Sequence, residues 1–380
     1  MAQRAAVLGV GQTRFKKQPE VAVEALAHEA VRAAAADAGI ALDDIDAAFV
    51  GSVTMHGGVG QRCLKEIGLT RIPIVNVENA CSSGSTAVRE AYAWVAAGLA
   101  DVAVAVGVDS LSTAMPSGVQ LDLDDPNGMG MGLVLPGTYA LEATHYMHEY
   151  GATAEHLAAI AVKNRGNAAM NPLAHFQKPV TLDEVLASKM ICEPLTMFEC
   201  CSNTDGAAAA IIATPEAARR LGHPGGVWIV ASAMGSGTFN DHPAQLDRAT
   251  PRVAAKAYEA AGIGPDDVDL VELHDSFAIA EWVYIEELGL AEEGKAWAQA
   301  AEGAFEIGGR VAVSPGGGLI GRGHPMGPTG VAQLCEATWQ LRGTAGARQV
   351  PDAKVAVTHT MGGNQFEMEA NACIVNVLAR

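Results

Sequence analysis

Apolar and polar positions follow a pattern that occurs twice along the chain. Residues 33–46 read AAAADAGIALDDID, and residues 256–269, which lie 223 positions further on, read KAYEAAGIGPDDVD. In each segment small apolar residues at helical spacing end at a glycine, an acidic turn follows, and an apolar run begins. The pattern predicts a helix, a turn and a strand in each copy, with the strands starting at Ala47 and Leu270.

A second matching block follows in each copy. Cys81-Ser82-Ser83-Gly84 precedes a helix expected over 85–97 and a strand over 102–106. His324-Pro325-Met326-Gly327 precedes a helix expected over 329–341 and a strand over 355–358. These blocks are about 20 positions further apart than the first pair, so we assign an insertion to 286–310. The repeat predicts two β-α-β-type halves with equivalent helix-opening turns.

Residues near 115–200 interrupt the repeat. Clusters of Gly, Pro, Met and Asn, little strand signal and one clear helix over 139–150 indicate an inserted loop domain. Apolar runs at 207–213 and 227–233 are expected to return as strands to the sheet of the first half. The predicted division is therefore 1–114 with 201–245 as the N-terminal half, 115–200 as the loop domain, and 246–380 as the C-terminal half.

Composition narrows the classes of function. The 380 residues are 49% hydrophobic, which supports a large folded core and excludes disorder. A net charge of −18 without a basic cluster argues against binding to nucleic acid. Seven cysteines without a C-x-x-C pair predict neither disulfides nor a metal site. No apolar stretch reaches the length of a membrane span, so a soluble, cytoplasmic protein is expected.

Cys81 and His324 are the strongest candidates for chemistry. Cys81 follows a predicted strand at 72–77 and precedes a helix, where backbone N–H groups lower the pKa of a thiol and favour a nucleophile. His324 occupies the equivalent turn of the second half, so a pseudo-twofold arrangement of the halves would bring the two side chains together. The alternatives are a small buried thiol at Cys81 and a helix-capping residue at His324.

Two further polar groups follow predicted strands. His274-Asp275-Ser276 and His359-Thr360-Met361-Gly362-Gly363 each come directly after an apolar run, where side chains reach the crevice of an open α/β sheet. The N–H of Gly362 is a candidate oxyanion donor. In both places an ordinary turn is the competing interpretation.

Four motifs together resemble the thiolase superfamily over essentially the full length. They are NACSSGSTA around Cys81, TDGAAAAII at 204–212, HDSF at 274–277 and GGGLIGRGHPMGPTG at 316–330. They are most similar to the branch that contains sterol carrier protein thiolases and their archaeal and bacterial relatives. The resemblance implies a five-layered α-β-α-β-α fold of two similar halves with an inserted loop domain, usually a dimer, that acts on coenzyme A thioesters without a permanently bound cofactor.

The resemblance also implies roles for the candidate residues. Cys81 would accept the acyl group, and His324 would activate it and contribute to the thioester oxyanion site. His274 stands where most thiolases have an Asn that holds a catalytic water, and the N–H groups of Cys81 and Gly362 would form a second oxyanion hole. The second catalytic cysteine of the family is missing, because Thr360 and Ser276 stand at its two usual places. His359, His324, a water on His274, or Ser276 as a much weaker acid, are left as proton donors.

Three functions remain open at this point. The first is a thiolase-type acyltransferase that cleaves a 3-oxoacyl-CoA, with an aromatic, branched or steroid-derived acyl group suggested by the missing acid. The second is a retro-aldolase acting on a 3-hydroxyacyl-CoA, and the third is a non-catalytic acyl-CoA or lipid carrier. Relatives without the second cysteine often have a small partner with a zinc ribbon and an OB-fold, and the scarcity of basic residues makes such a partner a reasonable expectation. Met129, Met131, Leu133 and Leu135 are expected to form an apolar wall of the substrate pocket.

Overall fold

The computed structural model describes residues 4–54, 57–116, 134–223, 226–238, 248–363 and 370–380. Its strands form a ten-stranded mixed sheet in the order β10-β9-β11-β12-β8-β1-β7-β4-β2-β3, which divides into two sets of five with the same pairing pattern. The first set is β3 (Ile74–Val77), β2 (Ala47–Gly51), β4 (Val102–Ser110), β7 (Asp205–Ala213) and β1 (Ala5–Gln12). The second is β10 (Ala312–Val313), β9 (Leu270–Glu272), β11 (Val355–Gly362), β12 (Ala372–Ala379) and β8 (Trp228–Gly235).

The two sets match strand for strand. In the first, β2 pairs in parallel with β3 and β4, and β7 pairs antiparallel with β4 and β1. In the second, β9 pairs in parallel with β10 and β11, and β12 pairs antiparallel with β11 and β8. The sets join where β1 and β8 pair antiparallel through Ala5↔Ile229 and Ala6↔Trp228. The predicted repeat is therefore a repeat of topology.

Strand β8 differs from its sequence-based expectation. The apolar run at 227–233 predicts a return to the sheet of the first half, as the run at 207–213 does in β7. Instead β8 pairs along β12, from Cys373↔Gly235 to Ala379↔Trp228, and meets the first half only at its start. Local hydrophobicity identifies a buried strand but does not specify its partner. The remaining domain boundaries stay predictions.

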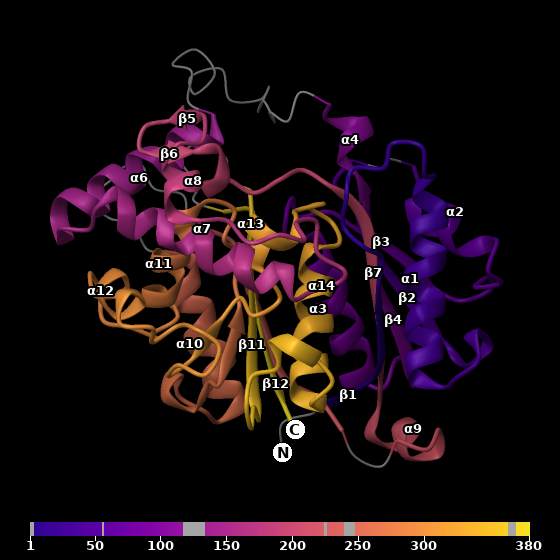
Figure 1. The fold of residues 1–380 in the computed structure, drawn as a ribbon. Coiled ribbons are helices and arrows are strands. Elements are labelled where there is room, and N and C mark those ends of the chain that lie inside the picture. The colour runs from indigo at the N-terminus through magenta and orange to yellow at the C-terminus, as the bar shows by residue number, and fades with distance from the viewer. Residues whose placement is uncertain (1–3, 55–56, 117–133, 224–225, 239–247, 364–369) are drawn as a thin grey trace.

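Helices and sheets alternate in five layers, as Figure 1 shows. Helix α1 (Val23–Ala38) covers the outer face of the first set of strands, with α2 (Val59–Lys65) beside it. Helix α10 (Ala249–Ala261) covers the outer face of the second set. Between the two sets lie α3 (Ser83–Ala96) and α14 (Thr329–Arg342), and their apolar side chains share one buried cluster with strands of both halves. The five-layered arrangement is confirmed.

The helix ends also follow the repeat. Helices α1, α10 and α14 each end at a glycine in the left-handed conformation, with φ of 62° at Gly39, 70° at Gly262 and 74° at Gly343. Short 3₁₀ turns at Leu42–Asp44 and Pro265–Asp267 occupy the two acidic segments and lead into β2 and β9. A left-handed residue after a helix satisfies the last carbonyls and reverses the chain, which explains the glycine in both copies.

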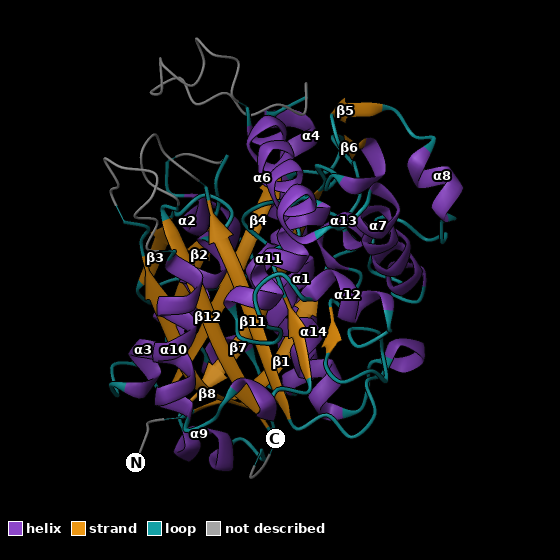
Figure 2. Ribbon diagram, turned by 90° about the vertical axis from the view of Figure 1, so that its left-hand side faces the viewer, coloured by secondary structure: helices purple, strands orange, loops and turns teal. Residues whose placement is uncertain are grey.

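The described part of the inserted segment, residues 134–200, packs beyond one end of the strands, as Figures 1 and 2 show. It contains α6 (Leu135–Tyr150), α7 (Ala154–Ala169), α8 (Leu182–Leu186), a small hairpin of β5 (Met190–Cys192) and β6 (Leu195–Thr196), and a 3₁₀ turn at Met197–Glu199. Its apolar side chains join the core of the second half, where the rings of Tyr146 and Trp282 stack with centroids 5.3 Å apart. The inserted segment therefore forms one wall against the second half.

Shorter helices complete the fold. They are α4 (Leu111–Ala114), α9 (Pro215–Arg220), α11 (Ala278–Glu287), α12 (Ala296–Ala301) and α13 (Gly318–Arg322), with a 3₁₀ turn at Gly346–Arg348. The insertion assigned to 286–310 corresponds to the end of α11, helix α12 and the turns after it. Within the described ranges, no helix is both long and apolar enough to cross a membrane.

Candidate active site

Cys81 lies in the turn between β3 and α3. The turn is tight, because Ala80 has a φ of 47°, a conformation that costs a residue with a Cβ free energy. Two hydrogen bonds hold it: Ala80 N–H donates to Glu78 Oε1 at 2.6 Å, and Asn79 N–H donates to Ser83 Oγ at 2.9 Å. The strained turn places Cys81 directly before Ser82, the N-cap of α3, so the thiol precedes a helix as the sequence predicts.

His324 lies in the equivalent turn between α13 and α14. This turn also holds a non-glycine residue with positive φ, Met326 at 55°. The His324 N–H donates to the Ser202 carbonyl at 2.9 Å, and the Nδ1 atom lies 2.9 Å from Thr329 Oγ1. The first contact holds the backbone and the second orients the ring, with Nε2 on the side of Cys81.

The two turns meet across the pseudo-twofold axis because glycines line the contact. A Cβ on Gly84 would overlap the Gly327 carbonyl, and a Cβ on Gly330 would overlap Ser85 Oγ. Buried Asp109 joins the halves as well, since its carboxylate accepts hydrogen bonds from Ser52 Oγ at 2.7 Å and from Gly327 N–H at 2.9 Å. The expected meeting of Cys81 and His324 therefore rests on backbone packing that admits no side chain.

Cys81 and His324 form a hydrogen-bonded pair. Cys81 Sγ lies 3.3 Å from His324 Nε2, and both residues are buried. Burial raises the pKa of the Cys81 thiol to about 12, an effect that a hydrogen bond from the Gly363 backbone only partly offsets. Burial, with the electrostatic influence of His274 and Arg322 adding to it, holds the pKa of His324 well below its ordinary value. The resting pair is thus a neutral thiol beside a neutral imidazole.

This result corrects the expected pKa of Cys81. Proximity to a helix N-terminus predicts a lowered pKa, but Cys81 is 9% exposed and the negative charges of Asp109 and Glu78 also disfavour the thiolate. Removing an anion from water costs more free energy than the partial charge at a helix end returns. The thiol must therefore lose its proton to His324 as it reacts, since a standing thiolate is disfavoured.

His274 joins this pair at the end of β9. Its ring lies edge-on to the ring of His324, with centroids 5.3 Å apart, and one ligand atom each from Cys81, His274 and His324 lies within 4.8 Å of the others. Burial lowers the pKa of His274 to about 3, so the imidazole is neutral, and its Nδ1 has no hydrogen-bond partner in the described residues. His274 thus places an uncharged imidazole beside the reacting pair. The absence of a metal here stays a prediction.

The two residues after His274 have different roles: one faces the pocket, and the other stabilises the backbone around it. Asp275 turns away and accepts hydrogen bonds from Leu319 N–H at 2.7 Å and Asn164 Nδ2 at 2.8 Å, which fixes the start of α13. Ser276 lines the pocket and hydrogen-bonds to the Tyr139 hydroxyl. Both interpretations of the HDSF segment therefore apply, with His274 and Ser276 facing the pocket and Asp275 stabilising the turn.

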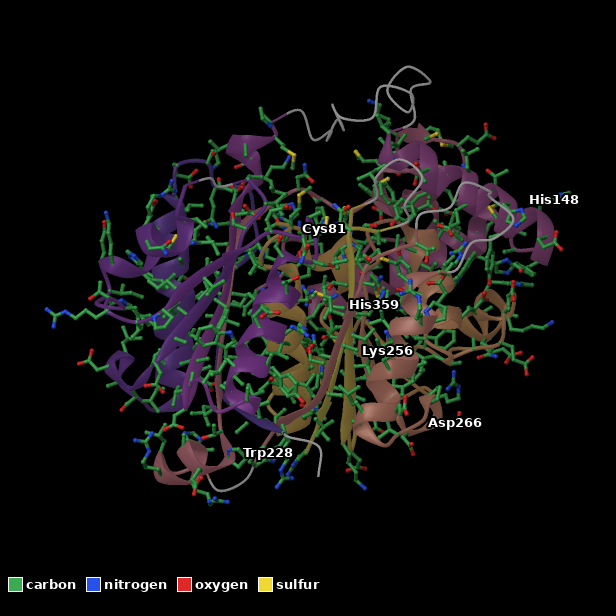
Figure 3. All side chains as sticks on the ribbon, turned by 180° about the vertical axis from the view of Figure 1, so that it is seen from behind. Cys81, His148, Trp228, Lys256, Asp266 and His359 are labelled. Carbon is green, nitrogen blue, oxygen red and sulfur yellow. The ribbon has the colours of Figure 1, made fainter. Side chains whose placement is uncertain are left out.

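His359 is not brought to the pocket. It is fully buried in β11, its Nε2 lies 3.1 Å from Thr250 Oγ1, and its ring packs on Tyr284 with centroids 4.6 Å apart. Figure 3 shows it lower in the molecule than Cys81. Burial lowers its pKa to about 3. A candidate proton donor must reach the substrate, so the geometry removes the reason for assigning that role to His359.

The backbone of Gly363 lies next to the Cys81 sulfur, where Gly362 is expected. Gly362 packs on the turn of Cys81 so closely that a Cβ would overlap the Asn79 carbonyl. The backbone group that hydrogen-bonds to the Cys81 thiol is that of Gly363, which also lines the pocket. Two N–H groups, of Gly363 and of Cys81 itself, therefore approach the sulfur, one residue along from the predicted donor.

These groups open into a pocket of about 870 Å³ between the two halves and the inserted segment. Cys81 comes from the first half, Met115 from the start of the inserted segment, and His274, Ser276, His324 and Met326 from the second half. Large apolar residues of the inserted segment complete the wall, including Leu135, Tyr139, Phe176, Met197 and Phe198. Leu135 confirms one member of the predicted wall, whereas Met129, Met131 and Leu133 lie outside the described residues.

Three residues of the site have no obvious signal in the sequence. Thr329 orients His324, Tyr139 contacts Ser276, and Cys201 lines the pocket with its N–H bonded to the Ser276 carbonyl at 2.9 Å. The vicinal pair Cys200-Cys201 suggests packing when it is considered alone. Of the three, Thr329 is the one that the sequence best indicates, because it begins the helix that follows HPMG and therefore lies close to His324.

Comparisons with known proteins agree with this geometry. The family model described as "Thiolase, N-terminal domain" matches residues 4–216, and that described as "Thiolase C-terminal domain-like" matches residues 231–375. Benzoylsuccinyl-CoA thiolase subunit BbsB of Thauera aromatica is 38% identical over 94% of each chain. An acetyl-CoA acetyltransferase of Methanothermobacter thermautotrophicus is also 38% identical, over 94% of this chain and 96% of its own length.

Solved structures support the same assignment. The chain matches "Ltp2-ChsH2(DUF35) aldolase" with a TM-score of 0.84, 28% identity and coverage of 100% and 98% of the two chains. It matches human mitochondrial 3-ketoacyl-CoA thiolase with a TM-score of 0.74 and 16% identity over 100% and 99%, which shows the shared fold. The chain belongs to the thiolase family and is an acyltransferase of the thiolase type.

Proposed function

We propose that this protein cleaves a 3-oxoacyl-CoA by a CoA-dependent retro-Claisen reaction through an acyl-Cys81 intermediate. The observation that carries the proposal is the 3.3 Å contact between Cys81 Sγ and His324 Nε2 at the wall of a large pocket. A thiol with a neutral base at hydrogen-bonding distance is the arrangement needed for covalent acyl transfer. CoA is a substrate in this reaction, and no permanently bound cofactor is required.

The first half-reaction forms the acyl-enzyme. His324 Nε2 accepts the thiol proton as Cys81 Sγ attacks the 3-oxo carbon. The N–H groups of Cys81 and Gly363 face the oxygen that becomes negative. The bond between C2 and C3 then breaks, its electron pair stays on C2, and the proton on His324 passes to that carbon. The products are an acyl-Cys81 thioester and a shortened acyl-CoA.

The second half-reaction returns the enzyme to its resting state. A free CoA thiol attacks the acyl-Cys81 carbonyl while His324 accepts the thiol proton. The Cys81 sulfur leaves and takes up that proton again. One base thus moves one proton in each direction, so the cycle balances without a second catalytic thiol. His274 supports it by placing a neutral imidazole within 4.8 Å of the reacting pair.

The pocket supports a bulky acyl group. Tyr139, Phe198 and Phe277 line it together with methionine and leucine side chains, which suit an apolar or aromatic acyl group better than a two-carbon unit. The relative from Thauera aromatica is named for benzoylsuccinyl-CoA, whose acyl group carries an aromatic ring. We therefore favour an aromatic or branched 3-oxoacyl-CoA over acetoacetyl-CoA.

We also propose that the chain works as a homodimer with a small second subunit. One relative is named as a subunit, and the name of the Ltp2-ChsH2(DUF35) aldolase joins two components. The net charge of −18 leaves this chain poorly suited to hold the phosphates of CoA alone, so a basic partner would supply that contact.

A retro-aldolase remains the second candidate, because one similar structure at 28% identity is named an aldolase. Incubating matched 3-oxoacyl-CoA and 3-hydroxyacyl-CoA esters with the enzyme, with and without free CoA, separates the two. We expect turnover of the 3-oxo ester that requires CoA. Cleavage of the 3-hydroxy ester independent of CoA would reject the thiolase proposal and support the aldolase.

A further inference from the structure

Two arginines, Arg165 and Arg248, line the pocket, and they differ in whether a carboxylate neutralises their charge. Arg248 lies 3.0 Å from Glu142 Oε1 and 2.7 Å from Glu287 Oε1, so two carboxylates neutralise it. Arg165, on α7, has no ion pair or hydrogen bond from its guanidinium among the residues that the structure describes. A buried cation without a counter-ion is costly, so its persistence at a binding pocket calls for an explanation.

The surroundings of Arg165 hold its guanidinium in place. The residue is 5% exposed, and its guanidinium carbon lies 3.3 Å from the ring centroid of Phe176 and 4.9 Å from that of Phe198. Its Nε and Nη1 atoms are buried without partners, and desolvation lowers its pKa to about 10. Stacking on aromatic faces fixes the plane of the fork, but it leaves the N–H donors free for an acceptor.

Charge on this side of the pocket has one sign. Lys17 is exposed and lines the pocket, and the pKa of His175 is lowered by burial and then by the charges of Arg165, Lys17 and Arg14. Arg14 itself is directed at backbone carbonyls, with Nε 3.2 Å from the Ala174 oxygen. The cations therefore reinforce one another at this end, which attracts an anionic group of the substrate.

This basic end is close to the reacting atoms. His175 N–H donates to the Arg322 carbonyl at 2.9 Å, and a Cβ on Gly323 would lie 3.2 Å from His175 Cβ. Gly323 directly precedes His324, and the His175 ring packs on Phe176 with centroids 4.3 Å apart. The guanidinium thus lies on the same pocket as the catalytic base and is connected to it through Phe176 and His175.

We propose that Arg165 binds a carboxylate carried by the acyl part of the substrate, so that the protein prefers 3-oxoacyl-CoA esters with a second, free acid group. The inference rests on the proposed function and specifies its substrate class. A carboxylate matches the planar fork of a guanidinium with two parallel hydrogen bonds. A phosphate of CoA is the other anion available, but its higher charge is harder to bury beside two phenylalanine rings, and Lys17 at the mouth suits it better.

The experiment compares three CoA esters of equal chain length: a 3-oxoacyl ester with a terminal carboxylate, its methyl ester, and the plain 3-oxoacyl ester. A second series carries the same three groups on a side chain at C2. For each series we measure kcat/KM with wild type, Arg165→Gln and Arg165→Lys. In wild type we expect the carboxylate to be preferred in at least one series, and in Arg165→Gln this preference should fall roughly 10-fold to 100-fold.

Because the preference is a ratio within one protein preparation, a loss of folded enzyme cancels. The double variant Glu142→Gln/Arg248→Gln is the matched control, since it removes a pocket guanidinium together with one of its two carboxylate partners and leaves the local net charge unchanged, so its preference should change less than about twofold. Arg165→Lys should retain charge and lose the bidentate fit, which gives an intermediate preference.

Two outcomes would overturn the proposal. One is equal kcat/KM for acid and methyl ester with wild type in both series. The other is a reduced preference of Arg165→Gln for CoA over pantetheine as the acyl acceptor. That result would show that Arg165 binds a phosphate of CoA and not a carboxylate of the acyl group. The proposed function is tested separately, because acylation of Cys81 by the plain ester does not depend on Arg165.

Discussion

The two turns at the centre of the molecule occupy equivalent places in the repeat and differ in chemistry. Cys81 precedes α3 and His324 precedes α14, and each turn contains a non-glycine residue with positive φ, Ala80 just before Cys81 and Met326 just after His324. One turn presents a nucleophile and the other a base, 3.3 Å apart. Duplication therefore supplies two matched positions that face each other, and the side chain at each position decides the role.

The electrostatic consequences of burial also differ between the turns. Loss of water raises the pKa of the acid Cys81 to about 12 and lowers the pKa of the base His324. Both shifts favour the neutral forms, so the same environment keeps each partner uncharged. The pair is ready to transfer a proton during the reaction and carries no ion pair at rest.

Removing the nucleophile from its turn should have the largest effect. Cys81→Ser keeps the turn but replaces the thiol with a much weaker acid and nucleophile, so kcat for CoA-dependent cleavage should fall at least ~10³-fold. His324→Gln should cause a similar fall, and the double variant should be little worse than either, because the two residues act as one unit. Steady-state cleavage rates check this, and cleavage by Cys81→Ser close to the wild-type rate would reject the role of Cys81.

Disrupting the glycine contact between the two turns should have the next largest effect, on the free energy of unfolding. Gly330→Ala places a Cβ against Ser85 Oγ at the crossing of α3 and α14, and overpacking of this kind should lower the free energy of unfolding by about 3 kcal/mol. Urea unfolding measures the change. Gly137→Ala is the control, because a Cβ there meets no atom within 4 Å and its φ is not left-handed. Equal stability of the two variants would show that the helices do not depend on the glycine contact.

The pH dependence of alkylation distinguishes a neutral pair from an ion pair across the two turns. With the Cys81 pKa near 12, the thiolate fraction rises tenfold for each pH unit below that value, and His324 stays neutral above pH 6.5 because its pKa is lowered. The rate of Cys81 modification by iodoacetamide should therefore rise ~100-fold from pH 7 to pH 9. Peptide mapping by mass spectrometry follows the site. A rate that is already constant at neutral pH would indicate a thiolate–imidazolium pair instead.

The smallest effect is expected from the residue that orients the base. Thr329→Val removes the hydroxyl 2.9 Å from His324 Nδ1 and keeps the side-chain shape. Loss of one buried hydrogen bond should lower kcat about 10-fold with little change in KM, and Thr329→Ser should restore most of the rate. Equal losses in both variants would place the effect on packing and leave the hydroxyl without a role.

The sequence contains much of this architecture because local signals and the repeat agree. The glycines that end α1 and α10 and the apolar runs of β2 and β9 identify the halves, and equivalent positions predict that Cys81 meets His324. Other features depend on contacts between distant segments. The partner of β8, the removal of His359 from the pocket and the approach of Gly363 in place of Gly362 follow from packing that no local pattern encodes.

The pKa of Cys81 and the charge pairing of the pocket arginines are the features of the site that the sequence predicts least well. The helix N-terminus at Cys81 indicates a low pKa, whereas burial and the charges of Asp109 and Glu78 set the actual direction. Among the described residues the Arg165 guanidinium has no carboxylate partner, whereas Arg248 has two, from the different helices α6 and α11, and no local pattern in the sequence distinguishes the two arginines. Both depend on which groups the folded chain brings together.

Covalent catalysis by Cys81 is tested most simply by intact-protein mass spectrometry after mixing the enzyme with an aromatic 3-oxoacyl-CoA in the absence of free CoA. We expect one added mass equal to the acyl group, located on Cys81 by peptide mapping, absent in Cys81→Ser and discharged when CoA is added. Cleavage of the ester by the same enzyme with no acyl adduct on Cys81, even after rapid acid quenching, would contradict the covalent mechanism.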